Sequence, residues 1–258
     1  MNFLANYFGS LNPMSFLSAL PGNIAQGIIW GLMGLGVFLT FKLLNFADLS
    51  VDGSFATGGA VTAVMLINGC PVWATIIVAI LAGLAAGLVT GLLHTLLGIP
   101  DILAGILTQI ALYSINLNIM GKSNLPISYR NYTLVVSASN INMAILVGLG
   151  ICAVVIAAMY WYFGTEQGST IRSTGSNPAM SKAQGININF TKVIALALSN
   201  GLVALSGSLF AQYQGFADIN MGRGAIVIGL AAVIIGEVLG EAIFRKHMNF
   251  CLLYTSPS

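Results

Sequence analysis

The sequence predicts an all-α protein, a polytopic bundle of about seven transmembrane helices, on three observations. Of its 258 residues, 57% are hydrophobic and only 6% are charged, against roughly 25% charged residues in a soluble domain. The mean hydropathy is +0.91. Seven apolar runs approach the length of about 20 residues that a helix needs to cross a bilayer. Lipid is therefore the solvent that fits this chain.

Composition also excludes other classes of protein. The net charge is +2 and the basic residues are scattered, so the chain lacks the positive footprint of a nucleic-acid binder. Its cysteines, Cys70, Cys152 and Cys251, are odd in number and have no paired spacing. They predict neither a disulfide framework nor a metal site.

The expected spans follow one another along the chain with short connections. They lie at residues 21–41, 53–69, 72–98, 101–120, 141–163, 190–213 and 222–244. The second is short, and the fourth begins directly after Pro100, a residue that suits a helix start. These two spans are the candidates for a broken or re-entrant helix.

Small residues four apart mark helix faces that neighbouring helices can approach closely. They occur in the first, third and seventh spans, as Gly27 and Gly31, then Gly83, Gly87 and Gly91, then Gly236 and Gly240. We expect them to pack helices within one subunit, and a subunit interface is the alternative.

Lysine and arginine counts predict the orientation, because positive loops stay in the cytoplasm. If residues 164–191 are cytoplasmic, that side carries Lys42, Arg172, Lys182, Lys192, Arg245 and Lys246, and the other side carries Lys122, Arg130 and Arg223. Six against three favours this choice, which places the N-terminus outside. Residues 1–247 then form one transmembrane domain, and 248–258 are expected to be a non-native or truncated tail.

The polar segment 164–186 contains residues that typically begin and end helices, at positions that predict two short helices. Gly175 can end the first in the left-handed conformation, and Asn177 can cap the second with its side-chain oxygen. Pro178 suits the first helical position, and Gly185 can end that helix. A short, capped, exposed helix is a surface that another protein can bind, although a solvated connector is the alternative.

Two stretches of the chain resemble a known family. The run from Arg172 through Gly175, Asn177-Pro178 and Gly185-Ile186 resembles the R-A-x-G-x-N-P-x-x-A-x-x-x-G-I coupling segment of ABC importer permeases, with Ser173 in place of Ala. This family includes branched-chain amino-acid and ribose permeases. Asn45-Phe46-Ala47-Asp48 resembles its N-F-A segment, and residues 180–187 are closest to an uncharacterised, amino-acid-related subgroup.

The resemblance implies a permease subunit of an ATP-driven importer in the bacterial cytoplasmic (inner) membrane, not an enzyme. Its solute would be small and polar, an amino acid or related compound. Partners would be ABC ATPase subunits, an extracytoplasmic substrate-binding protein and a second permease copy, forming a homodimer or a heterodimer. This chain would bind no cofactor or metal, and the partner ATPase would use ATP and Mg.

The resemblance also implies that segment 164–186 couples the bundle to the ATPase. Arg172 would pair with an acidic residue of the ATPase, while Ile171 and Met180 would fill its groove. The expected coupling residues are Glu166, Gly168, Ile171, Arg172, Gly175, Asn177, Pro178, Met180 and Gly185.

Two acidic residues, Asp48 and Asp52, lie between apolar spans, where a carboxylate is costly. Asp48 or Ser50 can cap the helix that begins near Gly53. The alternative is a broken helix lining the solute path, formed by Asn45, Phe46, Asp48, Asp52 and Gly53.

Two further interpretations concern how transport is powered. An ion-coupled secondary transporter or channel, acting through Asp48, Asp52, Glu237 or Glu241, is the alternative function. Residues 121–123 read Gly-Lys-Ser like the end of a phosphate-binding loop, but Asn116 occupies the position of its first glycine and no strand precedes it. We therefore expect no nucleotide site in this chain.

Overall fold

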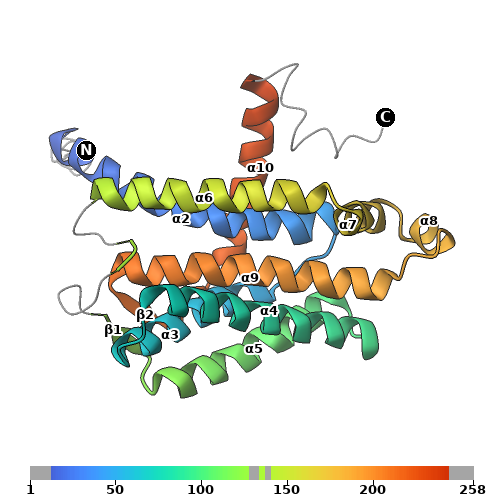
Figure 1. The fold of residues 1–258 in the computed structure, drawn as a ribbon, viewed down its shortest axis with the longest axis horizontal. Helices are drawn as coiled ribbons and strands as arrows, with labels where there is room; N and C mark the ends of the chain where they lie inside the picture. The colour runs from blue at the N-terminus through green and yellow to red at the C-terminus, as the bar shows by residue number, and fades with distance from the viewer. Residues whose placement is uncertain (1–12, 128–133, 137–140, 244–258) are drawn as a thin grey trace, which may run out of the picture.

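Long apolar helices run side by side in the computed structural model, which describes residues 13–127, 134–136 and 141–243 (Figure 1). The spans are α2 (Pro13–Phe38, continued by the π-turn η1, Leu39–Leu43), α3 (Ser50–Ile67), α4 (Val72–Leu96), α5 (Asp101–Met120), α6 (Ile141–Phe163) and α9 (Ile188–Gln214). Six helices are long and apolar enough to cross a membrane. The expected all-α polytopic bundle is confirmed.

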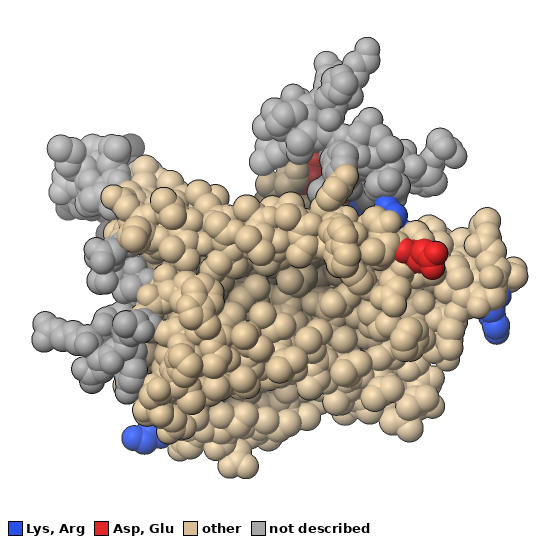
Figure 2. Space-filling model, viewed as in Figure 1, with Lys and Arg blue, Asp and Glu red and all other residues tan. Residues whose placement is uncertain are grey.

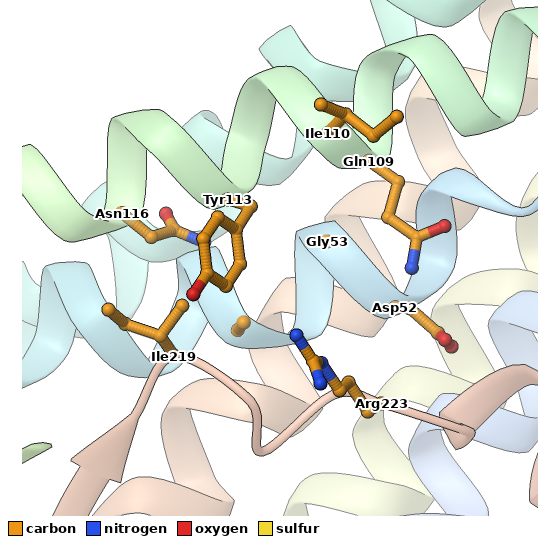
Figure 3. Close-up of a pocket in the computed structure, with 9 residues that line it drawn as sticks. Asp52, Gly53, Gln109, Ile110, Tyr113, Asn116, Ile219 and Arg223 are labelled. Atoms are coloured by element: carbon orange, nitrogen blue, oxygen red, sulfur yellow. The ribbon is translucent and has the colours of Figure 1, made fainter. Parts of the chain in front are cut away.

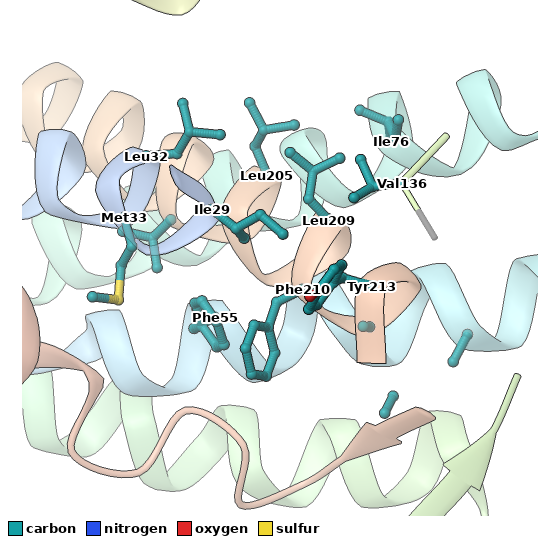
Figure 4. Close-up of a cluster of buried hydrophobic side chains, with 14 of the residues drawn as sticks. Ile29, Leu32, Met33, Phe55, Ile76, Val136, Leu205, Leu209, Phe210 and Tyr213 are labelled. Atoms are coloured by element: carbon teal, nitrogen blue, oxygen red, sulfur yellow. The ribbon is translucent and has the colours of Figure 1, made fainter. Parts of the chain in front are cut away.

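Two helices, α3 and α9, form the centre of the bundle, with most of their apolar length buried. Glycines allow this contact, because a Cβ at Gly58 of α3 would overlap the carbonyl oxygen of Ala204, and one at Gly207 of α9 would overlap that of Phe55. Side chains from α2, α3 and α9 fill the adjoining core (Figure 4). Phe55 stacks on Trp30 there, with ring centroids 5.3 Å apart.

The glycine stripe of α4 packs as expected, and the stripe of α2 does not. Cβ atoms at Gly83 and Gly87 would overlap carbonyl oxygens of α9. Cβ atoms at Gly27 and Gly31 would meet nothing within 4 Å. The prediction that the α2 stripe packs a helix within the subunit is therefore wrong for the described residues.

The chain breaks between α2 and α3, at the start of the second predicted span. Residues 44–49 are not helical, and Asn45 is left-handed with φ of 53°. Irregular backbone survives at membrane depth only where protein satisfies its polar groups. Phe46 accordingly donates its N–H to the carbonyl of Thr40 at 2.9 Å, and Gly105 of α5 leaves room for the backbone of Leu49. The fourth span, by contrast, is a continuous helix that starts directly after Pro100.

The two ends of the bundle differ. At one end lie the short helices α7 (Glu166–Ser176) and α8 (Pro178–Ala183), and at the other β1 (Asn124–Pro126) pairs with β2 (Phe216–Asp218) (Figure 1). The pairing is antiparallel, with Asn124 opposite Asp218. In Figure 2 the bundle below α10 is almost uncharged along its length, as a lipid-facing surface requires.

Basic residues sort to these ends as the loop count predicts. Lys42, Arg172, Lys182 and Lys192 belong to segments at the α7 end, and Lys122 and Arg223 to segments at the strand end. Arg130, Arg245 and Lys246 lie outside the described residues, as does the tail 248–258.

The seventh apolar run forms α10 (Ala225–Ile243), which runs across the other helices (Figure 1). Its first part, Ala225–Val238, is apolar. Lys42 of η1 binds Glu237 at 2.8 Å and ties α10 to the end of α2. The structure does not describe the side chains of Glu241 and Arg245.

Candidate functional site

The helix α7 is anchored to the bundle by close backbone contacts. Its cap is Thr165, whose hydroxyl accepts the N–H of Gly168. A Cβ at Gly175 would overlap the carbonyl oxygen of Leu43, and one at Gly168 would overlap the backbone of Phe163. Gly175 lies inside the helix and has no positive φ. The expectation that it ends the helix in the left-handed conformation is wrong, because close packing against η1 is what requires glycine here.

The helix α8 has the ends that the sequence predicts. The side-chain oxygen of Asn177 accepts the N–H of Met180 at 3.0 Å, and Pro178 occupies the first turn. Gly185 follows the helix with φ of 83°. This short helix is therefore held by its own capping residues.

Only part of segment 164–186 is open to a partner. Ile171 is 1% exposed and packs against Leu39, Phe46 and Leu196. The expectation that Ile171 fills a groove of the ATPase is therefore wrong, because its side chain belongs to this chain's own core.

The exposed coupling candidates cluster around α8. Met180 is 59% exposed. Arg172 is half-buried, and its guanidinium donates to the carbonyl of Phe163 at 3.0 Å, which fixes α7 to the end of α6. The exposed members of the predicted set are Glu166, Asn177, Pro178, Met180 and Gly185.

Asp48 organises a buried polar cluster at the start of α3. Its Oδ1 accepts the N–H of Ser50 at 2.9 Å and the Ser50 hydroxyl, and its Oδ2 accepts Nδ2 of Asn200 at 2.7 Å. Ser54 donates to Oδ1 of the same asparagine. The helix-capping interpretation of Asp48 is confirmed, because its carboxylate satisfies the first N–H of α3.

Asp52 caps the start of α10. Its Oδ2 accepts the N–H of Gly224 at 3.0 Å, and its Oδ1 accepts the N–H of Ile226 at 2.9 Å. These groups belong to the first turn of α10, where orphan N–H groups favour a carboxylate. Asp52 thus joins α3 to α10. It also lines a pocket.

This pocket lies between α3, α5 and the turn before α10 (Figure 3). Its volume is about 320 Å³. It is lined by the first two turns of α3, by residues 109–116 of α5 and by the chain following β2. Its lining residues are Asp52, Gly53, Ala56, Gln109, Ile110, Tyr113, Asn116, Ile219 and Arg223.

The pocket contains a buried amide without a partner. Asn116 is 1% exposed, and neither its Nδ2 nor its Oδ1 has a hydrogen-bond partner among the described residues. Leaving such a group unsatisfied costs about 1–3 kcal/mol. An unsatisfied amide facing a pocket is a group that a ligand can satisfy.

Charge also converges on this pocket. The exposed Arg223 holds its guanidinium over Tyr113, with Cζ 5.9 Å from the ring centroid. Within the described residues no ion pair joins Arg223 to Asp52. A cation and a carboxylate thus stand on separate walls of one cavity.

The structure divides the predicted solute-path residues into two groups. Asp52 and Gly53 line the pocket. Asn45, Phe46 and Asp48 are not among its lining residues. Phe46 is buried, with its ring edge-on to His94 at 5.0 Å.

Sequence reasoning missed seven of the nine pocket residues, among them the four with polar groups, Gln109, Tyr113, Asn116 and Arg223. Gln109, Tyr113 and Asn116 recur at four- and three-residue intervals along one face of α5, and this polar spacing in an apolar helix is the signal that could have found them. Arg223 follows β2 in a turn with no apolar periodicity, so only the fold brings it to α5.

Comparison with known proteins gives consistent matches over most of the chain. The family profile described as "Branched-chain amino acid transport system / permease component" matches residues 22–244. The chain is 45% identical over 224 residues to the tyrosine transport system permease protein of Clostridioides difficile (strain R20291), covering 86% of this chain and 74% of that protein.

Two other relatives extend the comparison. The uncharacterized protein RP368 of Rickettsia prowazekii (strain Madrid E) is 32% identical over 226 residues, covering 88% of this chain and 78% of that protein. The D-allose transport system permease protein AlsC of Escherichia coli (strain K12) is 28% identical over 234 residues, covering 89% and 71%. No solved structure is significantly similar to this chain.

Proposed function

This chain belongs to the family of permease components of branched-chain amino acid transport systems, and from this premise we propose that it moves a small polar solute through an ATP-driven ABC importer. It is a multi-pass protein of the inner membrane, with six apolar helices long enough to span. The 45% identity to a protein named as a tyrosine permease favours an amino acid as the solute over the sugar of the D-allose permease.

The observation that carries the proposal is the exposed α7–α8 pair at one end of a membrane-spanning bundle (Figure 1). A loop that only connects two spans needs neither the side-chain caps of α7 and α8 nor the close backbone contacts of Gly168 with Phe163 and of Gly175 with Leu43. We assign the exposed surface around Pro178 and Met180 to contact with the ATPase. Coupling then needs a rigid link from this surface to the solute path.

Packed residues supply such a link. Ile171 of α7 contacts the buried residues of η1 and the 44–49 segment, among them Leu44 and Phe46. That segment ends at Asp48, which caps α3. The first turn of α3 carries Asp52 into the pocket. A displacement of α7 by the ATPase is therefore transmitted to one wall of the pocket through directly packed elements, as in a rigid-body switch.

The partners follow from the same proposal. A separate ATPase subunit hydrolyses ATP with Mg, an extracytoplasmic protein delivers the solute, and a second permease copy completes the path. One face of α5 supports the last assignment, because Ser114 and Asn118 are exposed on it. Polar side chains are expensive against lipid and usually face protein or water.

The acidic residues weigh against an ion-coupled transporter. Asp48 holds Ser50 and Asn200, Asp52 caps α10, and Glu237 binds Lys42. Each of these carboxylates therefore has a structural partner in the described part of the chain. The family relationship points in the same direction.

The decisive experiment places a charge on the exposed surface of α8. Met180→Asp should abolish ATP-dependent uptake in proteoliposomes that contain the complete transporter, because a charge blocks apolar docking, while the permease still folds. The matched control is Met143→Asp, since Met143 is similarly exposed, 63% against 59%, near the other end of the bundle. Undiminished uptake by Met180→Asp would contradict the coupling role, and uptake without the ATPase would contradict ATP-driven import.

A further inference from the structure

We propose that the pocket between α3, α5 and the turn before α10 binds the zwitterionic head group of an amino acid, with Arg223 holding the carboxylate and Asp52 the ammonium. The assignment rests on the proposed import function and names the solute class of its pocket. It follows from the placement of opposite charges, from an unsatisfied amide and from the position of the cavity.

Opposite charges on separate walls suit a dipolar ligand. Arg223 extends from the turn before α10 toward α5, and Asp52 lies on α3 (Figure 3). The guanidinium can hold a carboxylate with two parallel N–H donors. Each oxygen of Asp52 accepts one neutral backbone N–H, which leaves its negative charge and further lone pairs for an ammonium.

Asn116 supplies the independent observation. Its amide is fully buried, faces the pocket and has no partner for either polar atom. One amide offers both a donor for a carboxylate and an acceptor for an ammonium. Gln109, two helical turns before Asn116 on the same helix, offers the same pair of groups. A zwitterion uses both kinds of group at once, and its two charges also match those of Arg223 and Asp52.

The remaining wall fits an apolar or aromatic side chain. Ile110, Tyr113 and Ile219 line the cavity beside the polar groups. The volume of about 320 Å³ lies at the lower end of the roughly 300–1,000 Å³ range of small-molecule pockets. This size suits a single amino acid, and it does not suit an oligosaccharide or a dinucleotide.

A neutral sugar is the competing ligand, since one relative is named as a D-allose permease. Hydroxyl groups can satisfy Asn116 and Gln109. They provide no counter-charge for the half-buried carboxylate of Asp52 and none for the exposed guanidinium of Arg223. The charges therefore favour the amino acid.

The experiment measures equilibrium binding to the permease–ATPase complex in lipid nanodiscs, without nucleotide and without the binding protein. The probes are radiolabelled L-tyrosine, L-leucine and L-glutamine, with D-allose as the sugar. Tyramine, which lacks the carboxylate, and 3-(4-hydroxyphenyl)propionate, which lacks the ammonium, serve as competitors. At least one amino acid should bind saturably, and D-allose should not. Removing either charged group from the tyrosine skeleton should weaken competition at least tenfold.

Two variants separate recognition from folding. Arg223→Gln should weaken amino-acid binding at least tenfold and leave tyramine competition unchanged, because tyramine has no carboxylate. Asn116→Leu replaces an unsatisfied amide by an apolar group of similar size, so it should lose binding while the thermal stability stays equal or rises. The matched control is Asn118→Leu, an exposed position on the same helix that does not line the pocket.

Several outcomes would overturn the assignment. These are saturable binding of D-allose without any amino acid, no binding of any of the three amino acids, or an equal loss of amino acid and tyramine in Arg223→Gln. Each leaves ATP-driven import intact if uptake still requires the ATPase. Conversely, uptake without the ATPase would refute the import mechanism and leave amino-acid binding standing.

Discussion

A single buried carboxylate, Asp48, holds the break between α2 and α3. It satisfies the backbone N–H and hydroxyl of Ser50 and the side-chain amide of Asn200 near the middle of α9. These donors are buried, and their other acceptors are the side chain of Asn200 for the Ser50 hydroxyl and the carbonyl of Leu196 for the Asn200 amide. The residue therefore fixes the start of the helix that carries Asp52 into the pocket.

Asp48→Ala should destabilise the folded permease by about 1–3 kcal/mol, since buried donors lose their acceptor. Thermal unfolding of the purified protein in detergent would show a lower midpoint. Uptake should fall only in proportion to the folded protein recovered. The conservative Asp48→Asn variant should recover part of the stability, because its carbonyl oxygen still accepts. Normal stability combined with lost transport in Asp48→Ala would instead place Asp48 in the solute path.

Gly175 is required by the close approach of α7 to η1. Gly175→Ala would drive a methyl group into the carbonyl of Leu43, and such overpacking costs about 1–3 kcal/mol. We expect a lower unfolding midpoint and weaker coupling of ATP hydrolysis to uptake. Gly150→Ala is the control, because Gly150 lies within α6 and a Cβ there meets nothing within 4 Å. Equal behaviour of the two variants would contradict the close-packing role.

Residue-scale prediction succeeds where local chemistry decides the outcome. Asn177, Pro178 and Gly185 act as their residue types suggest, because caps and turn conformations depend on neighbours a few positions away. Gly175 and Ile171 do not. Both lie in a polar stretch. Only tertiary contact shows that Gly175 packs tightly against η1 and that the side chain of Ile171 is buried between η1 and α9.

At the scale of elements, α10 is held by two contacts with the bundle. Asp52 caps its first turn, and Glu237 pairs with Lys42 at 2.8 Å. Glu237→Lys should destabilise the permease by about 1 kcal/mol, because it sets two cations together in place of a partly exposed pair. The exchanged pair Lys42→Glu with Glu237→Lys should restore the unfolding midpoint. If the double variant loses as much stability as Glu237→Lys alone, the pair does not hold α10.

Spans are predictable from this sequence, and their directions are not. Apolar length gave the position of α2, α4, α5, α6 and α9 closely, because lipid imposes a common length on a spanning helix. Hydropathy says nothing about the angle of a helix, so it predicts the helix at 222–244 without showing that α10 runs across the others. Likewise the pocket needs α5 beside residues 219–223, a pairing that no local pattern encodes.

At the scale of the whole molecule, the proposed coupling surface and the pocket are separate places on one bundle. The exposed helix pair α7–α8 lies at one end, and the pocket lies between α3, α5 and the turn before α10. Central helices α3 and α9 connect them through tight glycine contacts. Cores packed in this way shift as bodies between discrete arrangements. This architecture allows a displacement of α7 at one end of the bundle to alter the pocket.

The last prediction tests whether the two ends of the bundle face opposite sides of the membrane. With the natural cysteines replaced, Met180→Cys should react with a membrane-impermeant maleimide only in inverted vesicles, because the excess of Lys and Arg places α8 in the cytoplasm. Position 122 is exposed just after α5. Lys122→Cys should react only from the outside, in intact cells with a permeabilised outer membrane. The two variants control each other for expression and reactivity. Labelling of Met180→Cys from outside would remove α8 from the reach of any ATPase, whereas labelling of both positions from one side would contradict the arrangement of the bundle itself.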